Sequence, residues 1–227
     1  MFSSELELQK CFHKLLCNQI NRNEEIIDEF NARFGNVDIV RVTNNNSIFF
    51  TKEQAEMLSE FRHARIVSLL HRKAVRTLEY IKICSGYDTN SVKYSLKKLI
   101  SAEIVEEVSP YRYLINDNFS FPFLEFTSYE AKLYDWKKAI TQANNNKNFS
   151  TYSYVVFPKK MAMKLYLTKP DYFKYNNIGL IGVTQDSFNI YLDVKKKNIS
   201  LKRNATLISS MAKFTLLEYN QVKKLTI

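Results

Sequence analysis

The chain has 227 residues, of which 45% are hydrophobic and 14% aromatic, enough apolar material for one or two domains with a sizeable core. Its formal net charge of +10 favours an anionic partner, although the Lys-rich and Asn-rich composition of many AT-rich genomes also explains such a charge. No signal-peptide pattern and no apolar stretch of bilayer length is present, so we expect a cytoplasmic protein without membrane contact. Three cysteines without metal-ligand spacing and three histidines argue against a zinc site and a serine–histidine–aspartate triad.

The N-terminal part predicts a helix followed by a β-hairpin. Apolar residues recur at helical spacing over residues 4–20. Alternating residues predict strands at 26–30 and 37–42, and Gly35-Asn36 marks the turn between them. A polar break at residues 44–47 closes this part of the chain.

Residues 47–118 predict a separate, mainly helical domain. A capping box at Thr51 predicts one long helix that continues to Leu70, and a second helix covers 75–84. A third helix begins near Asp88 or Thr89, and short strands follow at 104–108 and 111–115. Three helices followed by a β-ribbon resemble a winged helix-turn-helix domain.

The remainder of the chain, residues 119–227, predicts alternating strands and helices. The pattern gives a strand at 124–133, a helix from 134 to about 145 and a buried strand at 152–157. A hairpin with strands at 178–183 and 188–194 comes next, and the tail is predicted to be helical from Ala205.

Two charged residues on one predicted strand are candidates for catalysis. Glu130 and Lys132 are separated by Ala131, so in a strand they project from the same side. Alone, such a pair is most often an exposed ion pair. Asp38 lies between Val37 and Ile39 in another apolar strand, where a buried carboxylate without a cation or donors costs several kcal/mol. A metal ion shared by Asp38 and Glu130 would satisfy both carboxylates.

The order of these elements resembles the PD-(D/E)XK nuclease superfamily. The stretch SYEAKLYDWKKAITQA is its most specific part and is similar to the RecB-like branch, in which a glutamine, here Gln142, follows E-x-K on the next helix. The resemblance implies an α/β restriction-endonuclease-like core with a mixed central sheet flanked by helices. Residues 1–46 and 119–227 would form this core, and the winged helix of residues 47–118 would be inserted into it.

The resemblance also implies roles for individual residues. Asp38, Glu130 and the carbonyl of Ala131 would bind Mg²⁺ or Mn²⁺, which prefer oxygen ligands. Lys132 would orient the attacking water and offset charge on the phosphate. Gln142 and Lys138 lie one helical turn apart and would face the site or the nucleic-acid backbone. An additional ligand is expected from an N-terminal glutamate, for which Glu5, Glu7 and Glu29 are the candidates.

The sequence departs from the family pattern at three points. A whole domain separates Asp38 from Glu130, where the family usually has about one hairpin. Val37 precedes Asp38 in place of proline, and Asn146 stands where the RecB-like branch has a tyrosine one turn after Gln142.

The inserted domain carries a basic face that is a candidate for nucleic-acid binding. Its third helix is expected to expose Asn90, Lys93, Tyr94 and Lys97, and Arg112 lies near the wing. Winged helices also serve as protein-interaction or dimerisation modules, which is the alternative reading. The run at 195–197 and the pair at 202–203 are basic and either grip phosphates or form solvated turns.

These patterns favour a metal-dependent DNA endonuclease, restriction-like or acting in defence against foreign DNA, as a homodimer or as a subunit of a defence complex. One alternative is a non-catalytic DNA-binding regulator on a degenerate nuclease fold. Another is a structural or partner-binding subunit whose charge is incidental. RNA stays open as a substrate.

Overall fold

A computed structural model describes residues 2–45 and 49–225 of the chain, which divide into two compact units. The sheet unit comprises Met1–Asn45 and Leu124–Ile199, and the helical unit comprises Asn46–Phe123 and Ser200–Ile227. Each unit is therefore assembled from two separate stretches of sequence. The expected boundary between residues 46 and 47, and the end of the expected polar break, lie outside the described residues.

The sheet unit is an α/β structure built on a mixed six-stranded sheet, which confirms the predicted fold class at this level. Its strands lie in the order β1 (Glu24–Asn31), β2 (Asn36–Asn44), β6 (Leu124–Ala131), β7 (Tyr152–Pro158), β8 (Gly179–Val183) and β9 (Phe188–Leu192). Strands β1, β2 and β6 are antiparallel neighbours, β6, β7 and β8 run parallel, and β9 returns antiparallel to β8. The pairing of β2 with β6 brings together segments separated by residues 46–123.

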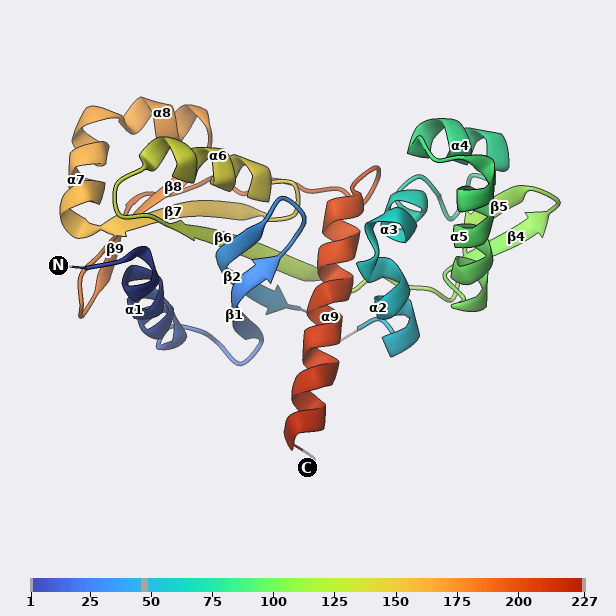
Figure 1. The fold of residues 1–227 in the computed structure, drawn as a ribbon, viewed down its shortest axis with the longest axis horizontal. Coiled ribbons are helices and arrows are strands. Elements are labelled where there is room, and N and C mark those ends of the chain that lie inside the picture. The colour runs from blue at the N-terminus through green and yellow to red at the C-terminus, as the bar shows by residue number, and fades with distance from the viewer. Residues whose placement is uncertain (1, 46–48, 226–227) are drawn as a thin grey trace. The chain divides into compact units, whose positions relative to one another are not determined.

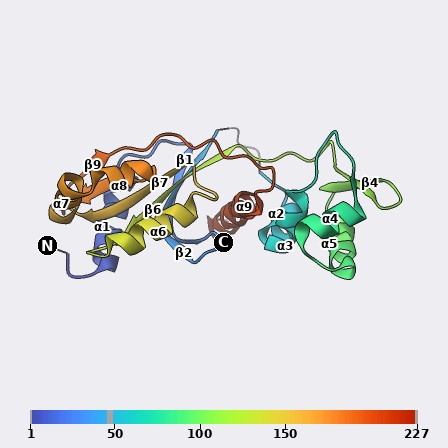
Figure 2. The ribbon, with the colours of Figure 1, turned by 90° about the horizontal axis from the view of Figure 1, so that it is seen from above.

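Helices cover both faces of this sheet. They are α1 (Glu5–Cys17), α6 (Trp136–Asn146), α7 (Lys159–Thr168) and α8 (Pro170–Tyr175). Helix α1 lies on one face, and α6, α7 and α8 lie on the other (Figure 1), the face seen from above in Figure 2. Ser4 and Asp135 cap the N-termini of α1 and α6, where their side chains accept backbone N–H groups. Helices α7 and α8 were not anticipated from the sequence.

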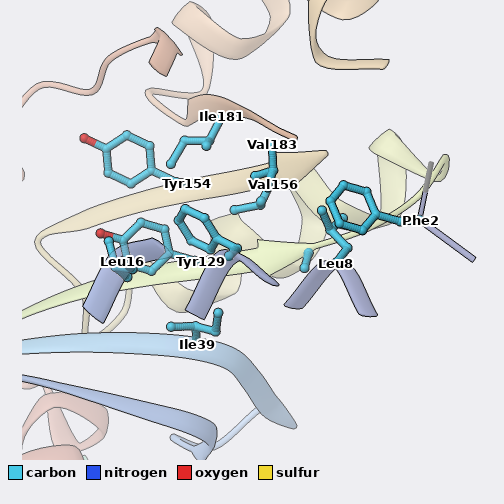
Figure 3. Close-up of a cluster of buried hydrophobic side chains, with 11 residues drawn as sticks. Phe2, Leu8, Leu16, Ile39, Tyr129, Tyr154, Val156, Ile181 and Val183 are labelled. Atoms are coloured by element: carbon cyan, nitrogen blue, oxygen red, sulfur yellow. The ribbon is translucent and has the colours of Figure 1, made fainter. Parts of the chain in front are cut away.

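Alternation along the strands divides the core of the sheet unit into two layers. Tyr129, Tyr154 and Val156 face α1 and pack with its Leu8 and Leu16 (Figure 3). Residues of opposite parity on the central strands pack against α6, α7 and α8; they include Val155, Phe157 and Leu180. Glu130 has the parity of the second layer, so its side chain is directed towards α6.

The helical unit combines a small sheet with a group of helices. The helices are α2 (Lys52–Ser59), α3 (Phe61–Val67), α4 (Leu78–Ser85), α5 (Thr89–Ser101) and α9 (Ala205–Leu225). The strands β3 (Arg76–Thr77), β5 (Arg112–Ile115) and β4 (Val105–Ser109) form an antiparallel sheet in that order. No helix in the described part of the chain is long and apolar enough to cross a membrane.

The single long helix expected from Thr51 to Leu70 is wrong, because two helices meet at Glu60. This residue has extended backbone angles (φ −73°, ψ 119°) and is the C-cap of α2 and the N-cap of α3. The ring of His63, which is 1% exposed, bonds to the Met57 carbonyl (Nδ1–O 3.0 Å) across the break. A buried, hydrogen-bonded histidine therefore spans the break between α2 and α3, which the spacing of apolar residues does not reveal. The capping box between Thr51 and Gln54 is present as predicted.

The C-terminal segment belongs to the helical unit, whereas the sequence placed it in the nuclease core. Helix α9 lies beside α2 in Figure 1 and also packs on α3. The Tyr219 hydroxyl donates to the Phe50 carbonyl (3.2 Å), and the rings of Phe49 and Phe214 are in contact. Helical periodicity correctly predicted a buried face on this segment, but it does not specify which apolar surface that face covers.

Candidate active site

Three carboxylates lie in a row across neighbouring strands of the sheet unit. In the β1–β2 pairing, Glu29 falls between the pairs Asp28↔Ile39 and Phe30↔Val37. The β2–β6 pairing ends at Ile39↔Tyr129, so Asp38 and Glu130 directly follow the last pair. The negative charges of Asp38 and Glu29 both raise the pKa of Glu130, so this arrangement calls for a cation.

The ammonium group of Lys132 supplies positive charge at this row. Lys132 Nζ lies 3.3 Å from Asp38 Oδ2, 2.9 Å from the Ala131 carbonyl and 3.5 Å from Glu5 Oε2. Asp38 Oδ2 also accepts the Ala131 N–H at 2.7 Å. Strand β6 ends at Ala131, one residue earlier than the predicted site requires, but the Lys132 N–H still bonds to the Val156 carbonyl of β7 (3.0 Å). Asp38, Ala131 and Lys132 thus meet as the sequence predicted.

Glu130 is the most buried member of the row, with 1% of its surface exposed. Its Oε1 accepts a hydrogen bond from Asn146 Nδ2 on α6 (2.7 Å). Its Oε2 is also buried and has no hydrogen-bond partner among the described residues. Burying a carboxylate oxygen without a hydrogen-bond donor costs free energy. A proton or a bound cation at Oε2 would remove this cost.

The environment shifts the pKa of each charged group in the site. Burial and the Asp38 carboxylate raise the pKa of Glu130 to about 7, against the Asn146 amide and the Lys132 ammonium. Burial also raises the pKa of Asp38, although Lys132 acts in the opposite direction. For Lys132, burial lowers the pKa, but Asp38, Glu5 and Glu130 outweigh burial and raise it. Lys132 is therefore an ammonium at neutral pH. Glu130, whose pKa is about 7, is present there in both its protonated and its ionised form.

Two of the three candidate N-terminal glutamates belong to this site. Glu5 reaches Lys132 from α1, and Glu29 raises the pKa of both Asp38 and Glu130. Glu29 adopts a left-handed backbone conformation (φ 52°). Glu7 instead bonds to Ser3 and to Gln185, away from the row, so the prediction that it could be a ligand finds no geometric support.

Gln9 and Asn146 complete the site and were not predicted as members of it. Gln9 Nε2 donates to the Asp38 carbonyl (2.7 Å) and to Glu29 Oε1 (3.2 Å), which fixes the edge of β2 against α1. Asn146 lies one turn after Gln142, at the position that the sequence marked as a departure. Helical spacing could have identified both residues as members of the site. Gln9 follows the candidate Glu5 by one helical turn, and Asn146 follows the candidate Gln142 by one turn.

Neither Gln142 nor Lys138 forms a side-chain hydrogen bond or ion pair with the carboxylates within the described residues, so their predicted roles find no support in these contacts. Gln142 Oε1 is buried and has no hydrogen-bond partner among the described residues. Lys138 is exposed on α6, and its backbone N–H is capped by Asp135. Helix α6 therefore reaches the site through Asn146, one turn further along than expected.

The oxygen donors of this site suit a hard divalent cation. Asp38 and the Ala131 carbonyl both accept from Lys132, and the Asp38 charge raises the pKa of Glu130. Within residues 2–45 and 49–225, no cluster of three or more His, Cys, Asp or Glu side chains is arranged to hold a metal ion. Mg²⁺ commonly binds through one or two carboxylates with waters and substrate phosphates, so two carboxylates and a carbonyl fit it.

In the helical unit, the residues predicted to contact nucleic acid share an exposed surface around α5 and the small sheet. They are Asn90, Lys93, Tyr94, Lys97 and Arg112. Lys93 Nζ lies over the Tyr111 ring, 5.2 Å from its centroid. In the basic run at 195–197, by contrast, Lys196 pairs with Glu125 and Lys197 Nζ bonds to the Lys147 carbonyl. Those two ammonium groups support the structure of the sheet unit.

No protein-family model, curated protein or solved structure matches this chain significantly. The geometry of the site therefore carries the functional assignment.

The buried Glu130 carboxyl makes the stability of the metal-free protein depend on pH. A pKa raised from 4.5 to about 7 means that its contribution to stability is present below pH about 4.5 and is lost as the pH rises through about 7. Glu130→Gln keeps an acceptor for Asn146 but does not titrate. In EDTA, we therefore expect its free energy of unfolding, relative to that of wild type, to rise by roughly 3 kcal/mol as the pH increases from about 4.5 to about 7. Urea unfolding at several pH values measures the gap. Glu25→Gln on β1 is the control, and a pH-independent gap would contradict the assignment.

Proposed function

We propose that this protein is a metal-dependent nuclease of the PD-(D/E)XK kind that hydrolyses phosphodiester bonds in DNA. The observation that carries the proposal is the meeting of Asp38 with Ala131 and Lys132, with Oδ2 2.7 Å from the Ala131 nitrogen and 3.3 Å from Lys132 Nζ. The helical unit separates these residues in sequence, yet the β2–β6 pairing makes them neighbours. These contacts support the part of the implied site that joins Asp38 to Ala131 and Lys132.

The topology of the sheet unit supports the same assignment. Helix α1, the antiparallel strands β1, β2 and β6, helix α6 and the parallel strand β7 follow one another in the order expected of that nuclease core. The first stretch of the helical unit, Asn46–Phe123, falls between β2 and β6, where the inserted winged helix was expected, and its second stretch follows the sheet unit. Sheet order alone does not define activity, so the charged residues carry the argument.

Asp38, Glu130 and the Ala131 carbonyl would hold Mg²⁺ or Mn²⁺ in this proposal. The bound ion would polarise the scissile phosphate and lower the pKa of a water. Asp38 is the more accessible of the two carboxylates, since 17% of its side chain is exposed against 1% for Glu130. Asn146 orients the Glu130 carboxylate and leaves Oε2 free for coordination.

Lys132 has two roles in this proposal, one without the metal and one with it. Without a metal, its ammonium neutralises Asp38 and Glu5. With a divalent cation held by Asp38, Glu130 and the Ala131 carbonyl, the Lys132 ammonium would be available to orient a water or to stabilise negative charge on the phosphate. Gln9 holds the Asp38 backbone through its carbonyl and so keeps the carboxylate in register with Ala131.

The helical unit supports DNA binding. Helix α5 and the adjoining sheet expose Lys93, Lys97 and Arg112, with Asn90 and Tyr94 on the same helix. Basic and amide side chains of this kind contact phosphates and base edges. They also favour the second candidate function, a non-catalytic winged-helix DNA-binding regulator on a degenerate nuclease fold. Restriction-like or defence activity is the biological role we propose for the catalytic alternative.

Cleavage assays with purified protein distinguish the two functions. We expect nicking or cutting of DNA in Mg²⁺ or Mn²⁺ and none in EDTA, measured by gel electrophoresis on duplex, single-stranded and modified DNA, with RNA tested in parallel. Electrophoretic mobility shifts in EDTA measure binding separately. Tight binding without cleavage of any of these substrates would overturn the nuclease and favour the regulator.

A further inference from the structure

A cavity of about 650 Å³ opens at the carboxyl ends of β6, β7 and β8 in the sheet unit. We call it the strand-end cavity. Leu133 and Tyr134, which directly follow Lys132, form part of its wall, so it adjoins the candidate active site. Its volume falls within the range of roughly 300–1,000 Å³ that is typical of small-molecule sites. Ligands of sheets with parallel strands commonly bind outside the carboxyl ends of those strands.

Close packing of α7 on β8 gives the cavity its basic wall. A Cβ atom on Gly182 would lie 2.9 Å from the Ala162 Cβ and 3.3 Å from the Lys159 Cα, so glycine permits this approach of helix to strand. Helix α7 begins directly after β7, and no side chain caps its N-terminus. Its first turns place Lys159, Lys160 and Lys164 in the lining.

Charge and surface chemistry define what the strand-end cavity can accept. The three lysines are exposed, and none forms an ion pair within the described parts of the chain; Asp186 is the one carboxylate among the lining residues. Leu133 and the buried Val183 contribute apolar wall, and the Tyr134 side chain is 70% exposed. An occupant therefore needs an anionic part for the ammonium groups and a flat apolar part to stack on a tyrosine.

We propose that the strand-end cavity receives an unpaired nucleotide of the DNA strand whose phosphate is bound at Lys132. This inference rests on the proposed function, because the proposed nuclease would act on a DNA strand at Lys132, next to the cavity. Tyr134 lies two residues beyond Lys132, at most about 7 Å along the chain, so a nucleotide next to the bound phosphate comes within its reach. Tyr134 stacks on the base, and Lys159, Lys160 and Lys164 bind the adjoining phosphates.

The substrate class follows from this occupant. Bases in an intact duplex are stacked and paired, so they enter such a cavity only if they are displaced at a cost. A single strand, an end or a mismatched site presents an unpaired base without that cost. The cavity thus favours DNA with unpaired nucleotides over intact duplex.

Binding in EDTA tests the cavity without cleavage. The probe is a short oligodeoxynucleotide with 2-aminopurine at each position in turn, as a single strand and as a duplex. We expect wild type to bind the single strand about tenfold more tightly than the duplex and to change the fluorescence at one or two positions. Tyr134→Ala and Lys160→Gln should each remove most of this preference. Tyr175→Ala and Lys169→Gln, exposed residues outside the lining, are the matched controls.

The outcomes separate this inference from the proposed function. If wild type cuts DNA with Mg²⁺ but Tyr134→Ala and Lys160→Gln bind single strands as the controls do, the cavity proposal is overturned and the nuclease stands. If wild type never cuts, yet the single-strand preference depends on Tyr134 and Lys160, the nuclease fails and the cavity is a nucleotide site. Equal losses in the control variants would also overturn the cavity proposal. Tyr134 is mostly exposed, so its substitution leaves the core intact.

Discussion

Replacing Lys132 with methionine is expected to lower the cleavage rate by about 10³-fold or more while DNA binding changes little. Methionine fills the space of the lysine stem but supplies no charge to the phosphate or the attacking water. Most contacts with DNA are expected elsewhere, on the exposed lysines of the helical unit and of the strand-end cavity. Single-turnover cleavage and mobility shifts measure the two effects. Lys10→Met, an exposed lysine on α1, is the matched control.

The same variant has a second, independent consequence in the absence of metal. Lys132 Nζ is the cation for Asp38 and Glu5, so Lys132→Met leaves the largely buried Asp38 carboxylate without it. We expect a loss of about 2 kcal/mol in the free energy of unfolding in EDTA, which Mn²⁺ should restore. Full activity in Lys132→Met would remove Lys132 from the reaction. Unchanged stability in EDTA would show that its ammonium does not balance the carboxylates.

Replacing Asp38 with asparagine is expected to weaken Mn²⁺ binding by about 100-fold and to abolish cleavage. The amide oxygen can still accept the Ala131 N–H, so the strand register is preserved while the charge is lost. Isothermal titration calorimetry with Mn²⁺ measures the affinity, and thermal unfolding verifies that the variant folds. Its pH dependence is informative too, because Glu130 loses a neighbour that raises its pKa.

Asp171→Asn, an exposed acid on α8, is the matched control for this substitution. It removes the same charge from the sheet unit without touching the row of carboxylates. An Asp38→Asn protein that binds Mn²⁺ as tightly as this control would exclude Asp38 as a ligand. In that case the meeting of Asp38 with Lys132 would be a structural ion pair.

The meeting of Asp38 with Ala131 and Lys132 was predictable because each lies in or next to an apolar strand. Alternation along a strand determines which residues share a face. A carboxylate among buried neighbours requires a positive charge or hydrogen-bond donors close to it. The predicted strand at 124–133 ends two residues early, at Ala131, yet Lys132 still lies beside Asp38. Only the pairing of β2 with β6, which no local pattern specifies, turns this expectation into a site.

Other parts of the site depend on contacts between distant segments and could not be predicted. Gln9 and Asn146 are ordinary polar residues on helices, and their roles arise from where α1 and α6 pack on the sheet. The sequence over 159–177 lacks a clear helical stripe, so α7 was missed together with the cavity it lines. The corner at Glu60, which the bond between His63 and Met57 spans, was also missed.

The interleaved composition of the two units has a consequence for synthesis on the ribosome. Strand β2 emerges early, but its neighbour β6 follows only after residues 46–123 have been made. The helical unit, in turn, gains α9 only after the sheet unit's last strand has emerged. Neither unit can finish folding while a large part of the other is still to be translated, so both complete late. A nascent chain therefore keeps the Asp38 carboxylate apart from Lys132 until most of the protein exists.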